Sequence, residues 1–346
     1  MASTIVTRQQ AVARDKSMLI GGIGFDRLMA GLALLFISGL YLDGWAHNHG
    51  LVDNTFFTPW HAVLYSSYVL NAIVLVSTLC INHARGRSWL TALPGGYELS
   101  FLGVPLFLAA GAGDMVWHIL FGFEVGIDPL LSPTHLLLAL GGMLIMSGPL
   151  RAGWRRATRE QGWSMLWPVI LSLGVILALF SFFTSFAHPV VETDLITNFP
   201  YTEDKGSWGA ASVLLQSAIM MGFVLFALRR WRLPLGALTL ILTLNTTLIC
   251  FFQDEYLLII TTVLAGVILD LLYWRLQPST KRLEALRVFA FAFPLIYNLC
   301  FFVPIILYNG SIPWTIHLWL GVSCMSGVAG LLLSYLLVPP KMPVEQ

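Results

Sequence analysis

Two stretches of the sequence gather carboxylates and imidazoles at matching spacings. In each, an Asp precedes a His by four residues, and a second His ends a Thr-Pro-Trp-His or Ser-Pro-Thr-His run further along. The residues are Asp43, His47 and His61 in the first stretch and Asp114, His118 and His135 in the second. One carboxylate and two imidazoles form a ligand set suited to copper, zinc or iron, so each stretch is a candidate metal site.

Helical geometry predicts how these residues would meet. An Asp and a His four residues apart lie on one face of a helix, one turn from each other. The Thr or Ser before each Pro suits the N-cap position, and the Pro suits the first helical position, so His61 and His135 would be third in their helices. Because the arrangement occurs in two hairpins, we interpret helices 1–4 as an internal repeat. The same spacings would also fit an Asp–His hydrogen bond and an ordinary helix start without metal.

Further polar residues lie close to these stretches and could orient or replace the ligands. They are His49, Asp53, Glu124, Asp128 and His188. The outer segment 188–208 could also cover the site.

Composition predicts the elements that hold these residues. The 346 residues are 57% hydrophobic and 11% charged, with a mean hydropathy of +0.77, whereas soluble domains carry roughly 25% charged residues. Apolar runs of about 20 residues can each cross a membrane. They cover approximately 24–44, 58–82, 98–119, 131–149, 165–187, 207–229, 234–252, 255–274, 285–307 and 314–337. The predicted fold is an all-α, polytopic integral membrane helix bundle of about ten transmembrane helices.

Basic residues predict the orientation of this bundle. On the ten-helix reading, all Lys and Arg residues except Lys205 fall on one side. This side is then cytoplasmic, with both termini, and the two Asp/His stretches face outward from a bacterial-type plasma membrane. We divide the chain into a cytoplasmic segment 1–23, two metal-motif hairpins 24–150, helices 5–10 in 151–338, and a tail 339–346.

Other classes of function find little support. The net charge of +1 and the lack of a Gly-rich phosphate loop argue against nucleic acid as a partner and against nucleotide binding. The four cysteines fall inside predicted spans without a CxxC pair, which argues against a disulfide framework and a thiolate metal site.

The first stretch resembles a known copper motif. Asp43 and His47, followed by Phe-Thr-Pro-Trp-His ending at His61, resemble the C subunit of particulate methane and ammonia monooxygenases. The second stretch matches less closely, and helices 5–10 do not share the resemblance. It implies that the Asp and both His residues bind copper at the outer side of the membrane. That family has one copy of the motif, fewer helices and two partner subunits, which favours a shared metal motif over a shared reaction.

Three functions remain open at this point. The leading hypothesis is a membrane copper protein that acts as a monooxygenase-like oxidoreductase on a small or lipophilic substrate. It would contact membrane lipid and need an electron donor, and other membrane subunits could join it. The first alternative is a metal transporter or metal-delivery protein, with Gln216, Asn245, Asn298 and Asp270 as polar groups within the membrane. Asp270 is expected instead to pair with Arg275. The second alternative is a non-catalytic assembly subunit.

Overall fold

The computed structural model describes residues 19–51, 58–122, 124, 126–156 and 162–340. Within these residues each predicted apolar run is helical, which confirms the all-α prediction. The long helices are α2 (Gly22–Asn48), α3 (Pro59–Ala84), α4 (Glu98–Phe121), α8 (Trp163–Phe183), α10 (Glu203–Arg230), α11 (Ala237–Gln253), α12 (Leu257–Leu276), α13 (Leu283–Asn309) and α14 (Ile316–Leu337). In the described part of the chain, eight helices are long and apolar enough to cross a membrane, as a polytopic helix bundle requires.

The fourth predicted span is bent. It forms α6 (Pro133–Met146) and α7 (Gly148–Arg155), whose axes differ by 43°. Pro149 explains the break, because a proline inside a helix has no N–H and its ring clashes with the carbonyl one turn earlier. The Arg151 guanidinium compensates at the bend: it donates to the Leu144 carbonyl at 2.8 Å and also to Ser147.

The seventh predicted span, α11, has only 17 residues and is held at its start by a neighbouring helix. Asp270 of α12 accepts hydrogen bonds from Leu238 N at 3.2 Å and from Thr239 N at 2.9 Å. The first amides of a helix have no partner within it, so a carboxylate there stabilises the helix. The predicted pairing of Asp270 with Arg275 is therefore replaced by a helix cap.

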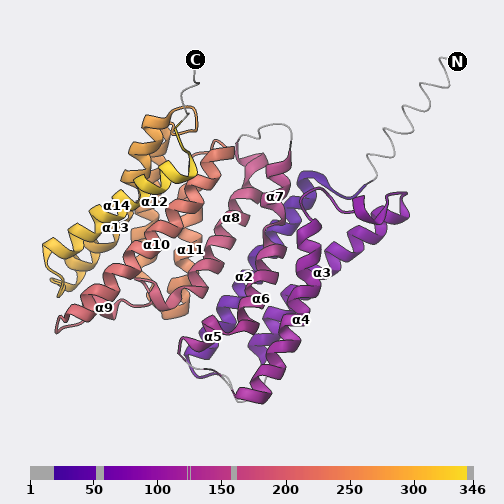
Figure 1. Ribbon diagram of the computed structural model, residues 1–346, viewed down its shortest axis with the longest axis horizontal. Helices are drawn as coiled ribbons and strands as arrows, with labels where there is room; N and C mark the ends of the chain where they lie inside the picture. The colour runs from indigo at the N-terminus through magenta and orange to yellow at the C-terminus, as the bar shows by residue number, and fades with distance from the viewer. Residues whose placement is uncertain (1–18, 52–57, 123, 125, 157–161, 341–346) are drawn as a thin grey trace.

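The helices form two groups joined by α8 (Figure 1). In the first group α2 packs against α3, and α4 packs against α6. In the second, α11 packs against α12, while α14 packs against both α10 and α13. Helix α8 contacts both α2 and α11, which also contact each other, and it is the most buried of the candidate spans.

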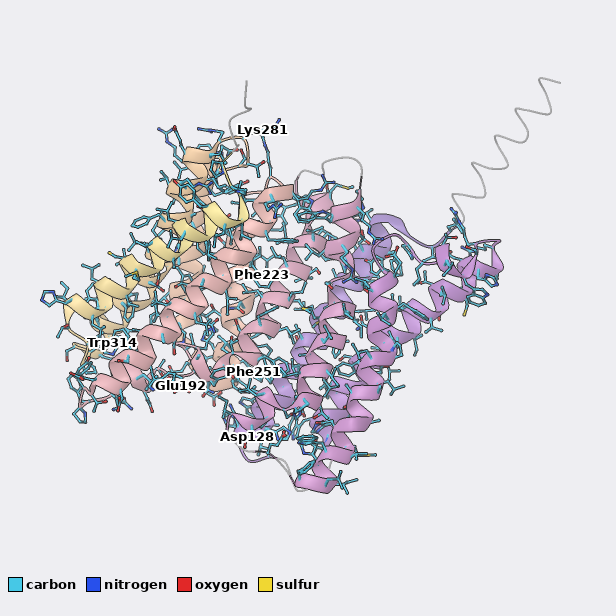
Figure 2. The ribbon with its side chains drawn as sticks, in the orientation of Figure 1. Asp128, Glu192, Phe223, Phe251, Lys281 and Trp314 are labelled. Atoms are coloured by element: carbon cyan, nitrogen blue, oxygen red, sulfur yellow. The ribbon has the colours of Figure 1, made fainter. Side chains whose placement is uncertain are left out.

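Two short helices mark one end of the bundle. They are α5 (Asp128–Leu131) and α9 (Asp194–Thr197), and they lie opposite the end where α2 starts and α14 finishes (Figure 1). Figure 2 shows Asp128 and Glu192 at this end and Lys281 at the other. The end that carries α5 and α9 is called the α5 end, and both Asp/His stretches lie there.

Candidate metal centre

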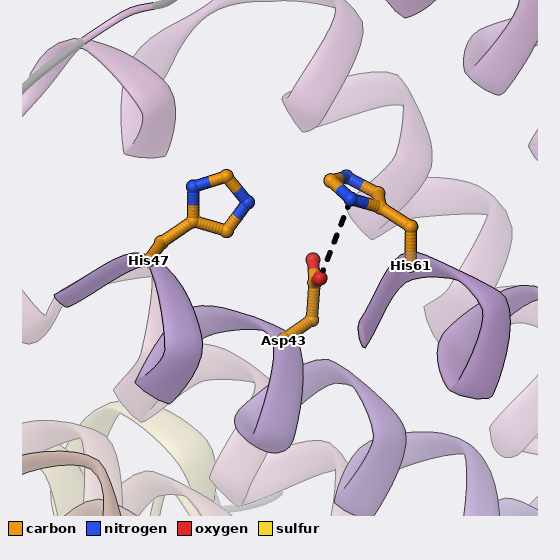
Figure 3. A group of neighbouring side chains, drawn as sticks. All are labelled: Asp43, His47 and His61. Carbon is orange, nitrogen blue, oxygen red and sulfur yellow. Dashed lines mark ion pairs between the residues drawn. The ribbon is translucent and has the colours of Figure 1, made fainter. Parts of the chain in front are cut away.

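The first stretch folds into a compact group, which we call the first triad (Asp43, His47 and His61). Helix α2 continues to Asn48, beyond its predicted end at residue 44, so Asp43 and His47 share its last turns. One ligand atom from each of the three residues lies within 4.8 Å of the others. Figure 3 shows the Asp43 carboxylate between the two rings, with its Oδ1 atom 3.5 Å from His61 Nδ1. The group has the size of a single metal site.

The start of α3 fixes the His61 ring. Thr58 is the N-cap and accepts a hydrogen bond from the His61 backbone N–H at 3.1 Å, and Pro59 is the first helical residue. The same Thr58 hydroxyl lies 2.9 Å from His61 Nδ1. The N-cap therefore both starts the helix and restricts the imidazole, as the Thr-Pro-Trp-His run predicts.

The second stretch forms a matching group, the second triad (Asp114, His118 and His135). Asp114 and His118 lie on α4, and His135 is the third residue of α6. The two oxygens of Asp114 face one imidazole each: Oδ2 lies 3.4 Å from His118 Nε2, and Oδ1 lies 3.6 Å from His135 Nε2. One ligand atom from each residue again lies within 4.8 Å of the others. Both sequence-predicted ligand sets are thus brought together.

Side chains around the second triad orient its ligands. Thr134 donates a hydrogen bond to Asp114 Oδ1 at 2.7 Å. Glu124 Oε2 lies 3.3 Å from His135 Nδ1, on the side of the ring away from Asp114. Trp117 in turn donates its indole N–H to Glu124 Oε1 at 2.8 Å. A carboxylate behind an imidazole is the usual arrangement at metal-binding histidines, because it fixes the ring and its tautomer.

The two triads open into the same cavity. Its volume is about 780 Å³, and all six triad residues line it together with Glu124 and Tyr65. The structure therefore places both candidate sites at one chamber.

The burial of the carboxylates tests whether a cation fits. Asp43 is 7% exposed and Asp114 is 2% exposed, and both pair with histidines. Asp43 Oδ1 is buried and accepts no hydrogen bond from any described residue. A buried carboxylate oxygen without a donor is costly, and a bound cation would remove that cost. Three ligands would leave coordination positions open toward the cavity.

Of the other predicted residues that the structure describes, Glu124 contacts a triad, whereas His49, Asp128 and His188 have other surroundings. His49 follows α2 and pairs with Asp254 at 2.8 Å, which joins α2 to the turn between α11 and α12. Asp128 is exposed at the start of α5. Asp53 lies outside the described residues.

His188 is buried in the segment after α8. Its Nδ1 accepts the Val190 N–H at 3.2 Å, and burial lowers the pKa of His188 to about 3. It therefore acts as a neutral acceptor within its own segment. The same segment does reach the cavity, where Val191 and Glu192 are lining residues.

Sequence reasoning missed Tyr65. Its ring stacks on that of His61, and it lines the cavity one helical turn further along α3. The four-residue spacing from His61 was a usable signal, because it places both side chains on the same face.

Comparisons with protein-family models, curated proteins and solved structures found no match for this chain.

Proposed function

We propose that this protein is an integral membrane metalloprotein that holds copper in its two Asp/His triads and acts as an oxidoreductase on a small or lipophilic substrate. The observation that carries the proposal is the convergence of both triads on one cavity, where Asp43 has a buried oxygen that accepts no hydrogen bond from any described residue. Paired sites at one chamber are better suited to chemistry on a shared ligand than to independent structural ions.

Copper is the first choice because two imidazoles and a carboxylate are suitable copper ligands. In addition, the first triad carries the residues of the monooxygenase-like motif. Zinc or iron would accept the same ligands. A bound copper ion would supply one-electron chemistry. The chain's own residues would orient the histidines, keep Asp43 and Asp114 in place, and restrict water at the cavity.

The proposed location is a bacterial-type plasma membrane, with both termini in the cytoplasm and the α5 end facing outward. The support is the distribution of Lys and Arg along the chain. Electrons would come from a separate donor, because the sequence carries no haem-attachment or flavin motif. Other membrane subunits could assemble with the bundle.

The transporter alternative would need polar groups to continue from the triads through the membrane. The described residues that line the inner part of the cavity are instead apolar, and they include Phe36, Leu138 and Met146. Gln216 donates to Thr184 and Asn298 donates to Ser217, so both have local structural partners. These contacts favour a closed site over a conduit.

Metal analysis of the purified protein tests the proposal. The protein would be prepared with copper, zinc and iron all supplied, and compared with Asp43→Asn and Asp114→Asn. Each substitution keeps the size of the side chain but removes its charge, so each should lower the bound metal. Asp128→Asn is the control for both, because Asp128 is an exposed acid outside the triads, on the hairpin that carries Asp114. Unchanged metal in both triad variants would overturn the metal assignment, and zinc bound in place of copper would overturn the redox assignment.

A further inference from the structure

The cavity continues below the triads as an apolar chamber. Its walls come from four helices of the first group and from α8. They include Phe36, Leu64, Phe107, Leu138, Met146 and Leu179. A chamber with polar groups at one end and hydrocarbon walls elsewhere matches a ligand that is itself polar at one end.

The chamber is deep. Phe36 lies seven residues before Asp43 on α2, and Met146 lies eleven residues after His135 on α6. At about 1.5 Å of rise per residue, the lining extends roughly 10–16 Å below the triads. This is about a third to a half of the hydrocarbon core of a membrane, which is roughly 30 Å thick. A small gas molecule would leave most of this length empty.

The floor of the chamber is closed by packed side chains. Phe36 and Met146 are 3% and 2% exposed, and the Phe36 ring makes an edge contact with Phe107 at 5.1 Å between centroids. Gly142 leaves room above this floor: a Cβ there would be 3.7 Å from Met146 Cε and 3.8 Å from the Phe36 ring. This Cβ would contact side-chain atoms of the floor and no backbone, and Gly142 itself lines the cavity, so a larger side chain there should take up chamber space.

The polar end of the chamber limits the head group. Glu124 and Glu192 line the cavity and are not proposed metal ligands, so an anionic head would meet carboxylates that no bound metal ion neutralises directly. A neutral oxygen head could accept hydrogen bonds or fill an open coordination position without that repulsion.

We propose that the chamber binds a single-chain amphiphile with a neutral oxygen head group, such as a long-chain alcohol. The hydrocarbon chain lies between the triads and the floor formed by Phe36 and Met146, and the head lies at the triads. The position of the head rests on the proposed function, whereas the position of the chain does not.

Photolabelling of the full-length protein in lipid nanodiscs tests the chain position. The probe is dodecan-1-ol with a diazirine at the end of its chain, and the adducts are mapped by mass spectrometry. Adducts are expected at the chamber floor, on the peptides that contain Phe36 and Gly142–Met146. A phosphatidylcholine with the same diazirine at a chain end is the second probe. It is expected to label only lipid-facing positions, because its second chain and head group do not fit.

Gly142→Leu should abolish the floor adducts while leaving bound metal unchanged. Leu140→Phe is the matched control, because Leu140 lies on the same helix but is 41% exposed and does not line the cavity. It should leave the floor adducts in place. If Gly142→Leu does not fold, Ala139→Leu serves instead, because Ala139 also lines the chamber.

Three results would overturn the inference. The alcohol probe could label only lipid-facing positions, the floor adducts could persist in Gly142→Leu or Ala139→Leu, or the phospholipid probe could label the floor as strongly as the alcohol does. Floor adducts in a protein that binds no metal would support the chain position and reject the proposed function. Bound metal without floor adducts would reject only the amphiphile.

Discussion

The ring of Tyr65 stacks against the ring of His61, with their centroids 6.4 Å apart and their planes inclined by 22°. The hydroxyl of Tyr65 reaches toward α4, where a Cβ on Gly111 would lie 2.6 Å from it. Gly111 precedes Asp114 by three residues and so lies one helical turn from it. One tyrosine therefore connects a ligand of the first triad to the helix that carries two ligands of the second.

This contact predicts different effects for two glycines of α4. Gly111→Ala should lower stability by about 1–3 kcal/mol, because the added methyl group overlaps the Tyr65 hydroxyl. Gly113→Ala should be neutral or slightly stabilising, since its Cβ would meet only Thr134 Cγ2 at 3.9 Å and alanine favours the helix. Thermal unfolding in detergent compares the variants. Equal melting temperatures would contradict the close approach of Tyr65 to α4.

Glu124 should act as a positioning residue for His135. Glu124→Gln removes the charge behind the imidazole and should weaken metal binding at the second triad by roughly 10–100-fold. Metal titration in an Asp43→Asn background isolates this triad, and Asp128→Asn in the same background is the control. An affinity equal to that of the control would mean that the Glu124–His135 contact has no role in metal binding.

The two helix starts should differ in their response to loss of the hydroxyl. Thr58 caps α3 through the His61 N–H, whereas Ser132 makes no such cap. Its hydroxyl lies 2.6 Å from His135 Nδ1 and 3.5 Å from the Thr134 hydroxyl. Thr58→Ala should therefore cost about 0.5–2 kcal/mol of stability, and Thr58→Ser should restore it. Ser132→Ala should change the melting temperature less than Thr58→Ala does. The reverse order would show that the capping roles have been assigned to the wrong hairpins.

His188 should make stability depend on pH. Its pKa is lowered to about 3 in the folded protein by burial, against an unfolded value of about 6.5. Its neutral form contributes fully above about pH 6.5, and the contribution is lost as the pH falls from 6.5 toward 3, because only the unfolded chain takes up the proton there. By pH 5 the loss is about 2 kcal/mol.

His188→Asn keeps an acceptor for the Val190 N–H but cannot titrate. Melting temperatures measured between pH 7.5 and pH 5 should therefore fall less steeply in this variant than in the parent. Parallel curves would mean that His188 does not change its protonation on unfolding.

The orientation of the bundle can be read by labelling single cysteines in a cysteine-free protein. Glu203 and Lys281 are both exposed and lie in segments at opposite ends of the bundle. An impermeant maleimide applied to intact cells should label Glu203→Cys, and should label Lys281→Cys only after permeabilisation. The opposite pattern would reverse the topology and place both triads on the cytoplasmic side.

Local rules in the sequence determined the helices and the make-up of each triad. The four-residue spacing of Asp43 and His47 fixes a common helix face, and the Thr58-Pro59 pair fixes where the next helix begins. Both depend on residues only a few positions apart, and so both could be read without knowing how the helices pack.

Only the tertiary structure decided that the two triads share one chamber. It also decided that Glu124 contacts His135, whereas His49 pairs with Asp254. The capping of α11 by Asp270 is likewise a contact between two helices. The physical reason is that these helices are apolar on nearly every face, since lipid and neighbouring helices both favour hydrocarbon surfaces. Their periodicity therefore does not encode which faces meet. Close packing between particular helices makes that choice, and with it the shape of the cavity.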